Sequence, residues 1–147
     1  MKQKQRKLLW SLFALYVIAL VFLLLFRTPR SEYSYNLLPL KTIQEYLIVL
    51  SRSDSAGHAL WPYALANILG NTLLLVPLGV FLPLLFRWQR IFPIFLLTAL
   101  IMICLVELLQ YYTQLGALDV DDLILNLFGA SLGWLGWKIW PRSPEET

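Results

Sequence analysis

An uncharged run of nineteen residues, 8–26, reads LLWSLFALYVIALVFLLLF. At about 1.5 Å per helical residue, this run covers most of a hydrocarbon core about 30 Å thick. The basic residues before it, MKQKQRK at 1–7, are typical of the start of a secretory signal peptide. However, the run is longer than the apolar part of such a signal, and RTPR at 27–30 offers no small-residue cleavage site. The sequence therefore predicts a retained transmembrane helix.

The composition of the 147-residue chain favours an integral membrane protein. Apolar residues make up 59%, compared with about 45–50% in soluble domains, and charged residues 14%, compared with about 25%. These proportions exclude an ordinary soluble fold, and they exclude disorder, which needs low hydrophobicity and high net charge. The single cysteine, Cys104, excludes an intramolecular disulfide, and the single histidine, His58, argues against a His-rich metal site. We therefore expect no metal and no cofactor.

Three further apolar segments predict three more spans, at 62–86, 91–113 and 121–140. Pro62 fits the first turn of the second span, where its missing N–H costs nothing. Pro77, in the middle of that span, is expected to kink the helix. Each span is joined to the next by a short turn, except for the first connection.

The first connection, residues 27–60, contains a short amphipathic segment. Its apolar residues follow the spacing of one helical face: Ile43, Tyr46, Leu47 and Leu50. The predicted fold is therefore all-α, a polytopic membrane protein with four transmembrane helices and a short amphipathic helix in the first external loop. We expect a single domain over residues 1–147.

The distribution of Lys and Arg predicts the orientation of the spans. With a cytoplasmic N-terminus, eight of these residues lie in short inner segments and four are spread along the outer loop: Lys2, Lys4, Arg6, Lys7, Arg87, Arg90, Lys138 and Arg142 inside, and Arg27, Arg30, Lys41 and Arg52 outside. Both termini should therefore be cytoplasmic.

Placing a polar side chain in the hydrocarbon core costs free energy, so the positions of polar residues within the spans indicate where a functional site lies. With this topology they fall in the outer half of the bilayer, in three helical stripes: Asn67 and Asn71; Glu107 and Gln110; Asp119, Asp122 and Asn126. Three stripes at one depth predict a polar pocket that opens to the outside.

Two interpretations of this pocket stay open. Asn and Gln in membrane helices often serve as hydrogen-bonding contacts between helices. An ionised Glu107 would instead cost several kcal/mol unless it is paired, protonated or hydrated, which favours a functional or site-organising role. Glu107 and Asp122 are thus the candidates for an acid, a base or a metal ligand. Asp121 is expected at an exposed helix start, where a carboxylate interacts well with the helix dipole.

The remaining motifs favour packing over chemistry. Gly129 and Gly133 form a GxxxG pair, which permits either close packing inside the bundle or dimerisation. Gly79 follows Pro77 at the expected kink. Cys104 is expected to pack and His58 to lie in the loop. No phosphate loop and no nucleic-acid-binding surface is predicted.

Four short blocks follow one another along the chain. They are NLLPL at 36–40, NILGN and VPLG within 67–79, ELLQ at 107–110, and DVDD at 119–122 followed by Asn126 and Gly129. Together they resemble the motifs of the VanZ-like family of small bacterial membrane proteins. The resemblance covers most of the chain and implies a bacterial cell membrane location. It also implies a link to resistance against teicoplanin, a lipophilic glycopeptide antibiotic.

Within that resemblance, Asn36 and Pro39 belong to a loop motif, in which Leu40 replaces a common Phe. Gly116 stands where many relatives carry an Arg. If that Arg pairs with the acidic residues in relatives, this chain must accommodate its carboxylates differently.

Three functional classes remain open. The first is a non-catalytic envelope protein that binds a membrane lipid, a lipid-linked molecule or a lipophilic glycopeptide, or alters its access to the surface. The second is an enzyme acting on a lipid-linked substrate through Glu107 or Asp122. The third is a small transporter or pore subunit, which would need to assemble as a homo-oligomer.

Overall fold

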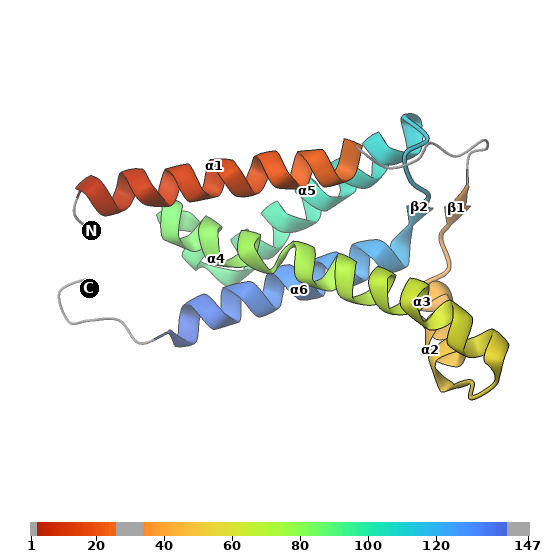
Figure 1. Ribbon diagram of the computed structural model, residues 1–147. Coiled ribbons are helices and arrows are strands. Elements are labelled where there is room, and N and C mark those ends of the chain that lie inside the picture. Colours follow the sequence, from red (N-terminus) through yellow and green to blue (C-terminus); the bar gives the residue numbers. More distant parts are fainter. Residues whose placement is uncertain (1–2, 26–33, 141–147) are drawn as a thin grey trace.

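The computed structural model describes residues 3–25 and 34–140, which are mostly helical (Figure 1). The elements are α1 (Gln3–Leu25), β1 (Tyr35–Asn36), α2 (Lys41–Ser51), α3 (Ser55–Leu74), α4 (Val76–Leu85), the 3-10 helix η1 (Arg87–Arg90), α5 (Phe92–Tyr112), β2 (Leu118–Asp119) and α6 (Val120–Ile139).

Three helical segments in the described part of the chain are long and apolar enough to cross a membrane: Gln3–Leu23, Ser55–Leu85 and Phe92–Tyr112. They correspond to the first three predicted spans. The segment predicted as the fourth span, 121–140, folds as α6, which is not one of these three. Two aspartates in its first turn lower its hydropathy.

The helix of the second predicted span begins before its apolar run, so the expectation that Pro62 lies in the first turn of this helix is wrong. α3 begins at Ser55, because Asp54 caps it by accepting a hydrogen bond from the Gly57 N–H at 2.9 Å. Pro62 lies inside the helix. The first turns of α3 pack against α2, where the Trp61 indole N–H donates to the Val49 carbonyl at 2.9 Å.

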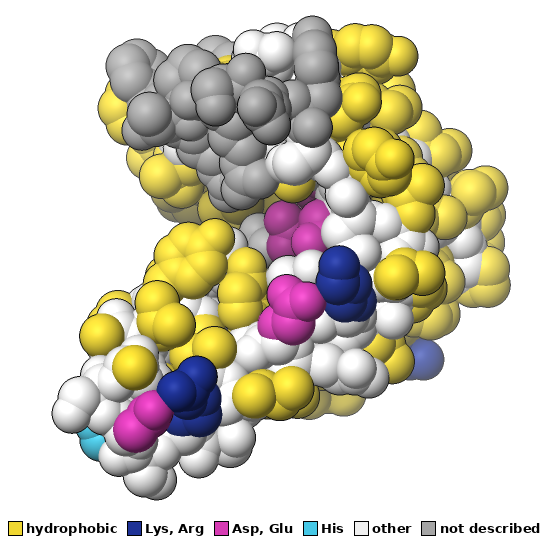
Figure 2. All heavy atoms as spheres, turned by 90° about the vertical axis from the view of Figure 1, so that its right-hand side faces the viewer, with side chains coloured by type: hydrophobic (Ala, Val, Ile, Leu, Met, Phe, Trp, Pro, Cys, Tyr) yellow, Lys and Arg dark blue, Asp and Glu magenta, His cyan; other side chains and the backbone are white. Residues whose placement is uncertain are grey.

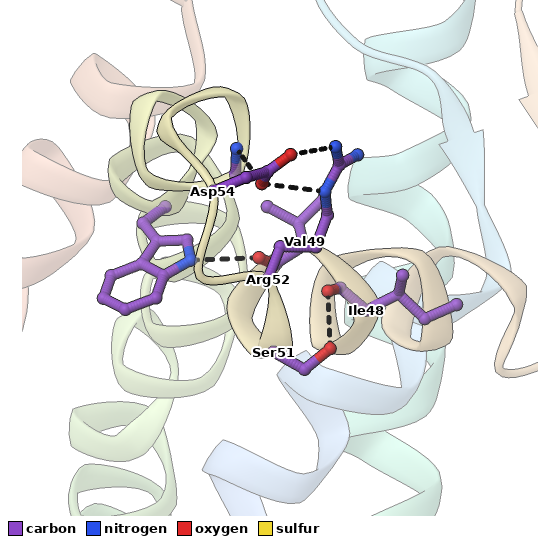
Figure 3. Close-up of polar contacts among 7 residues, drawn as sticks. Ile48, Val49, Ser51, Arg52 and Asp54 are labelled. Atoms are coloured by element: carbon purple, nitrogen blue, oxygen red, sulfur yellow. Dashed lines mark hydrogen bonds and ion pairs between the residues drawn. The ribbon is translucent and has the colours of Figure 1, made fainter.

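A turn held by polar contacts joins α2 to α3 (Figure 3). Arg52 forms a two-point ion pair with Asp54, with Nη2 to Oδ2 at 2.6 Å and Nε to Oδ1 at 3.1 Å. The Arg52 guanidinium, together with the Gly57 N–H, lowers the pKa of Asp54 from its ordinary value. The α2–α3 hairpin projects from one end of the bundle (Figure 1).

The second span is interrupted between α3 and α4, close to the expected kink. Leu75 has φ −101° and ψ 1°, which ends α3, and α4 restarts at Val76 with Pro77 in its first turn. Because proline lacks an N–H, it fits the start of a new helix better than the middle of a continuous one.

Glycine contacts bring α6 against the interrupted helix. A Cβ at Gly129 would overlap the Thr72 carbonyl oxygen, and one at Gly133 would overlap that of Val76. Gly79 on α4 likewise lies against the backbone of α6. The GxxxG pair is therefore placed at a contact inside the bundle, where α6 also packs against α5.

The first helix covers one side of α4. The rings of Phe13 and Tyr16 lie 5.6 and 5.8 Å from that of Phe81, measured between centroids. The Tyr16 hydroxyl also donates to the Leu74 carbonyl at 2.9 Å, at the point where α3 ends. This bond satisfies a carbonyl at the end of α3.

Candidate functional site

Polar residues from three helices surround one small cavity. Its volume is about 40 Å³, and its polar lining consists of Asn71 on α3, Glu107 and Gln110 on α5, and Asp122 and Asn126 on α6. Apolar residues complete the wall, including Leu74 and Leu75 at the helix interruption. At about 10–15 Å³ per water-sized group, the cavity admits about three such groups.

Four of the five polar residues in this lining are deeply buried, and Asp122 is half-buried. Asn71, Glu107, Gln110 and Asn126 are 7%, 4%, 6% and 8% exposed. Asn71 donates a hydrogen bond from Nδ2 to Asp122 Oδ1, which joins α3 to α6 across the cavity. Polar groups so far from water are stable only when they find partners in the protein or in a bound molecule.

Two buried atoms of this lining have no partner among the described residues. They are Gln110 Nε2, a hydrogen-bond donor, and Asn126 Oδ1, an acceptor. A molecule that both donates and accepts hydrogen bonds would satisfy them together. The site therefore has the chemistry to bind a small polar group.

Two residues predicted for the pocket lie elsewhere. Asn67 is half-buried and donates to the Tyr63 carbonyl at 2.8 Å, one turn back on its own helix. Asp119 lies at the start of α6, outside the lining of this cavity, and its carboxylate binds the segment that leads into α2. The cavity is therefore lined by only five of the seven residues in the three predicted polar stripes.

Asp119 anchors that segment through Asn36 and Thr42. Its Oδ1 accepts from Asn36 Nδ2 at 3.1 Å, and its Oδ2 accepts from the Thr42 hydroxyl at 2.7 Å. Asn36 also donates to Thr42 Oγ1 at 2.9 Å. A two-residue parallel pairing of β1 with β2 places Asn36 opposite Asp119. Pro39, from the same loop motif, is exposed just before α2.

Asp121 corrects the expectation of an exposed helix start, because it is fully buried, at 0% exposed. Its Oδ1 accepts from the Leu40 N–H at 2.5 Å and its Oδ2 from the Ile43 N–H at 3.1 Å. Leu40 precedes α2 with φ 67° and has no polar side chain with which to cap it. Asp121 therefore caps α2 from a distant part of the sequence.

The acidic end of α6 also affects Tyr46 on α2. Burial raises the pKa of Tyr46, a hydrogen bond with Tyr63 adds to the shift, and the negative charges of Asp122 and Asp119 act in the same direction. Figure 2 shows acidic side chains in the hollow beside the lobe formed by α2 and α3. The phenol therefore stays neutral at physiological pH.

The remaining candidates lie apart from the cavity. His58, expected in a loop, lies in the first turns of α3 with its ring 4.5 Å from that of Trp61. Cys104 is half-buried on α5. Among the described residues, no group of three or more His, Cys, Asp and Glu side chains is placed to hold a metal ion.

Comparison with known proteins places this arrangement in a family. The family model described as VanZ/LLP1 matches residues 13–141. The chain belongs to the VanZ/LLP1 family. Protein VanZ of Enterococcus faecium is similar to it, 26% identical over 133 residues, which are 90% of this chain and 73% of that protein. No solved structure matches.

In this VanZ/LLP1 protein, the residues of the four sequence blocks lie at two places in the fold. The block at 36–40 and the start of the block at 119–129 form the anchor between the loop and α6. The blocks at 67–79 and 107–110, together with Asp122 and Asn126, supply the cavity and the helix interruption beside it. Sequence reasoning missed the anchor because its partners lie about eighty residues apart.

Proposed function

We propose that this chain is a four-span protein of the bacterial cell membrane whose polar cavity binds the polar part of a lipid, a lipid-linked molecule or a lipophilic ligand in the outer leaflet. In the cell, this binding contributes to resistance against glycopeptides of the teicoplanin type. Both termini are cytoplasmic, and α6 is the fourth span.

The proposal rests on two buried atoms in the cavity, Gln110 Nε2 and Asn126 Oδ1, for which the described part of the chain supplies no hydrogen-bond partner. A structural contact between helices satisfies its own polar groups, whereas a binding site leaves groups for its ligand. The volume of about 40 Å³ limits the bound part to a small polar group, so the rest of the ligand lies outside the cavity.

The topology is supported by α6 lying in contact with α3, α4 and α5. A helix packed against three others has its polar residues shielded from lipid, so a lower hydropathy is compatible with a span. Single cysteines at Ser53 and Ser143, in a Cys104→Ala background, test the orientation. A membrane-impermeant maleimide should label Ser53→Cys and not Ser143→Cys in intact cells, and the reverse result would refute the outward cavity.

The binding role is tested by Gln110→Met, which keeps the side-chain length and removes the donor. Because Nε2 has no partner among the described residues, folding should be unaffected. In a host expressing the protein at matched membrane levels, this variant should lose the resistance conferred by the wild type. Leu109→Met, on the exposed face of the same helix, is the matched control and should keep it.

An enzymatic role is the second candidate, because two carboxylates, Glu107 and Asp122, line the same cavity. Paired carboxylates in different environments can serve as acid and base. A reaction product formed from a lipid-linked substrate by purified protein, and abolished in Asp122→Asn, would favour this candidate over binding alone.

A further inference from the structure

A second cavity lies next to Glu107, between α5 and the start of α6. Its volume is about 220 Å³, and its apolar wall is formed by Leu37, Cys104, Leu108, Leu118, Val120 and Leu123. Glu107 and Asp119 are its polar lining residues. Of these, Glu107 also lines the polar cavity, so the two spaces adjoin at this residue. We call the second space the apolar groove.

The apolar groove is suited to hydrocarbon. Six of its eight lining residues are apolar, and cavities with mainly apolar walls take up apolar ligands. Leu108 is 42% exposed, and its neighbours Leu105 and Leu109 are 62% and 57% exposed on a helix apolar enough to span a membrane. The groove is therefore continuous with a surface that faces lipid chains.

The adjoining polar cavity limits which type of headgroup an amphiphile bound in the groove can carry. Gln110 Nε2 donates and Asn126 Oδ1 accepts, so a hydroxyl or an amide satisfies both atoms. A phosphate or a fatty-acid carboxylate would instead be repelled by nearby carboxylates.

We propose that the apolar groove binds one alkyl chain of an uncharged amphiphile, whose hydroxyl or amide headgroup passes Glu107 and occupies the polar cavity. The inference rests on the proposed function and names the class of ligand. It also explains how a cavity with room for about three water-sized groups can serve a much larger membrane molecule.

The native cysteine provides the test, because Cys104 lines the groove and is the chain's one cysteine. Full-length protein in phosphatidylcholine nanodiscs is alkylated with N-ethylmaleimide, with and without dodecanamide, dodecanol or dodecanoate. At about ten times the Kd, dodecanamide and dodecanol should slow the reaction saturably by about tenfold, because only unoccupied protein reacts. Dodecanoate should protect far less.

The matched control moves the reporter out of the groove. The double variant Cys104→Ala/Leu105→Cys places the thiol one residue along the same helix, on an exposed position. Its alkylation should be unchanged by all three amphiphiles, because residue 105 does not line the groove. A non-specific effect of amphiphile in the bilayer would instead slow the reaction at both positions. Equal protection of the thiols at 104 and 105 from alkylation, or no protection at 104, would overturn the proposal that the groove binds an alkyl chain.

A separate variant, Gln110→Met, tests the assignment of the headgroup to the polar cavity. Gln110→Met should weaken protection of Cys104 by dodecanamide, and equal protection by dodecanoate and dodecanamide in the wild type would overturn the assignment. If Cys104 is not protected while Gln110→Met still abolishes glycopeptide resistance, the groove proposal is wrong and the proposed function stands. If Cys104 is protected and Gln110→Met leaves resistance intact, the site binds lipid and the proposed function is wrong.

Discussion

Asn71 on α3 donates a hydrogen bond to the carboxylate of Asp122 on α6, fifty-one residues further along the chain. The bond lies just before the interruption at Leu75 and lines the polar cavity. On α3, Asn71 immediately precedes Thr72, whose carbonyl lies against Gly129 of α6, about two turns after Asp122. Close backbone packing and a buried polar contact therefore fix the same helix pair.

Replacing Asn71 with Leu removes the donor and leaves the Asp122 carboxylate without this partner. The expected loss is about 1–3 kcal/mol in the free energy of unfolding, the usual cost of removing one partner of a buried hydrogen bond. Unfolding by sodium dodecyl sulfate from mixed micelles, followed by circular dichroism, measures it. Asn67→Leu is the matched control, because Asn67 bonds within its own helix and should lose less than about 0.5 kcal/mol. Equal losses would contradict the cross-helix role.

The glycine contacts predict a strongly position-dependent effect along α6. Gly129→Ala and Gly133→Ala place a Cβ against backbone carbonyls that cannot move without shifting a helix. Overpacking of this kind costs about 1–3 kcal/mol or more, measured by the same unfolding assay. Gly136→Ala meets nothing within 4 Å and should be neutral or slightly stabilising. If Gly129→Ala instead altered only self-association and left the free energy of unfolding unchanged, the placement of Gly129 at a contact inside the bundle would be wrong.

Much of the helical frame could be predicted because hydropathy dominates in a membrane, where every backbone polar group must be satisfied within the segment. The apolar run predicted at 91–113 corresponds to α5, Phe92–Tyr112, to within one residue at each end. The start of α3 was missed because its first turns pack on α2 and are capped by Asp54, which leaves no apolar run to detect.

The candidate site could be predicted in part, because helical spacing shows which residues share a face but not what covers them. Asn71, Glu107 and Asn126 do surround one cavity. Asn67 shares a face with Asn71 but lies one turn closer to the α2–α3 hairpin, where it bonds to its own helix. Asp121 is covered by a segment distant in sequence, so its burial had no local signal.

That covering segment gives a third prediction. Asp121→Asn replaces one acceptor oxygen with an NH₂ group, so either the Leu40 or the Ile43 N–H loses its partner. Hydrogen bonds to charged groups contribute about 1.5–3 kcal/mol, so local opening of the first turn of α2 should rise by about tenfold or more. Hydrogen exchange of a peptide covering residues 37–46 measures this. Asp54→Asn is the control, because it caps α3 and should leave that peptide unchanged.

The last prediction concerns Glu107, which lines both the polar cavity and the apolar groove. Glu107→Gln is nearly isosteric and keeps hydrogen-bonding ability while it removes the capacity for charge. It should therefore fold like the wild type and lose the glycopeptide resistance conferred at matched membrane levels. Glu45→Gln, on the exposed face of α2, removes one acidic group elsewhere and should leave resistance intact.

Two outcomes would count against this role. If Glu107→Gln confers full resistance, the carboxylate at 107 is not needed and the catalytic candidate loses its acid or base. If Glu107→Gln instead fails to accumulate in the membrane while Gln110→Met accumulates normally, Glu107 is a structural contact between helices. The binding role would then rest on Gln110 and Asn126, because their unsatisfied atoms face the same cavity without depending on a charge.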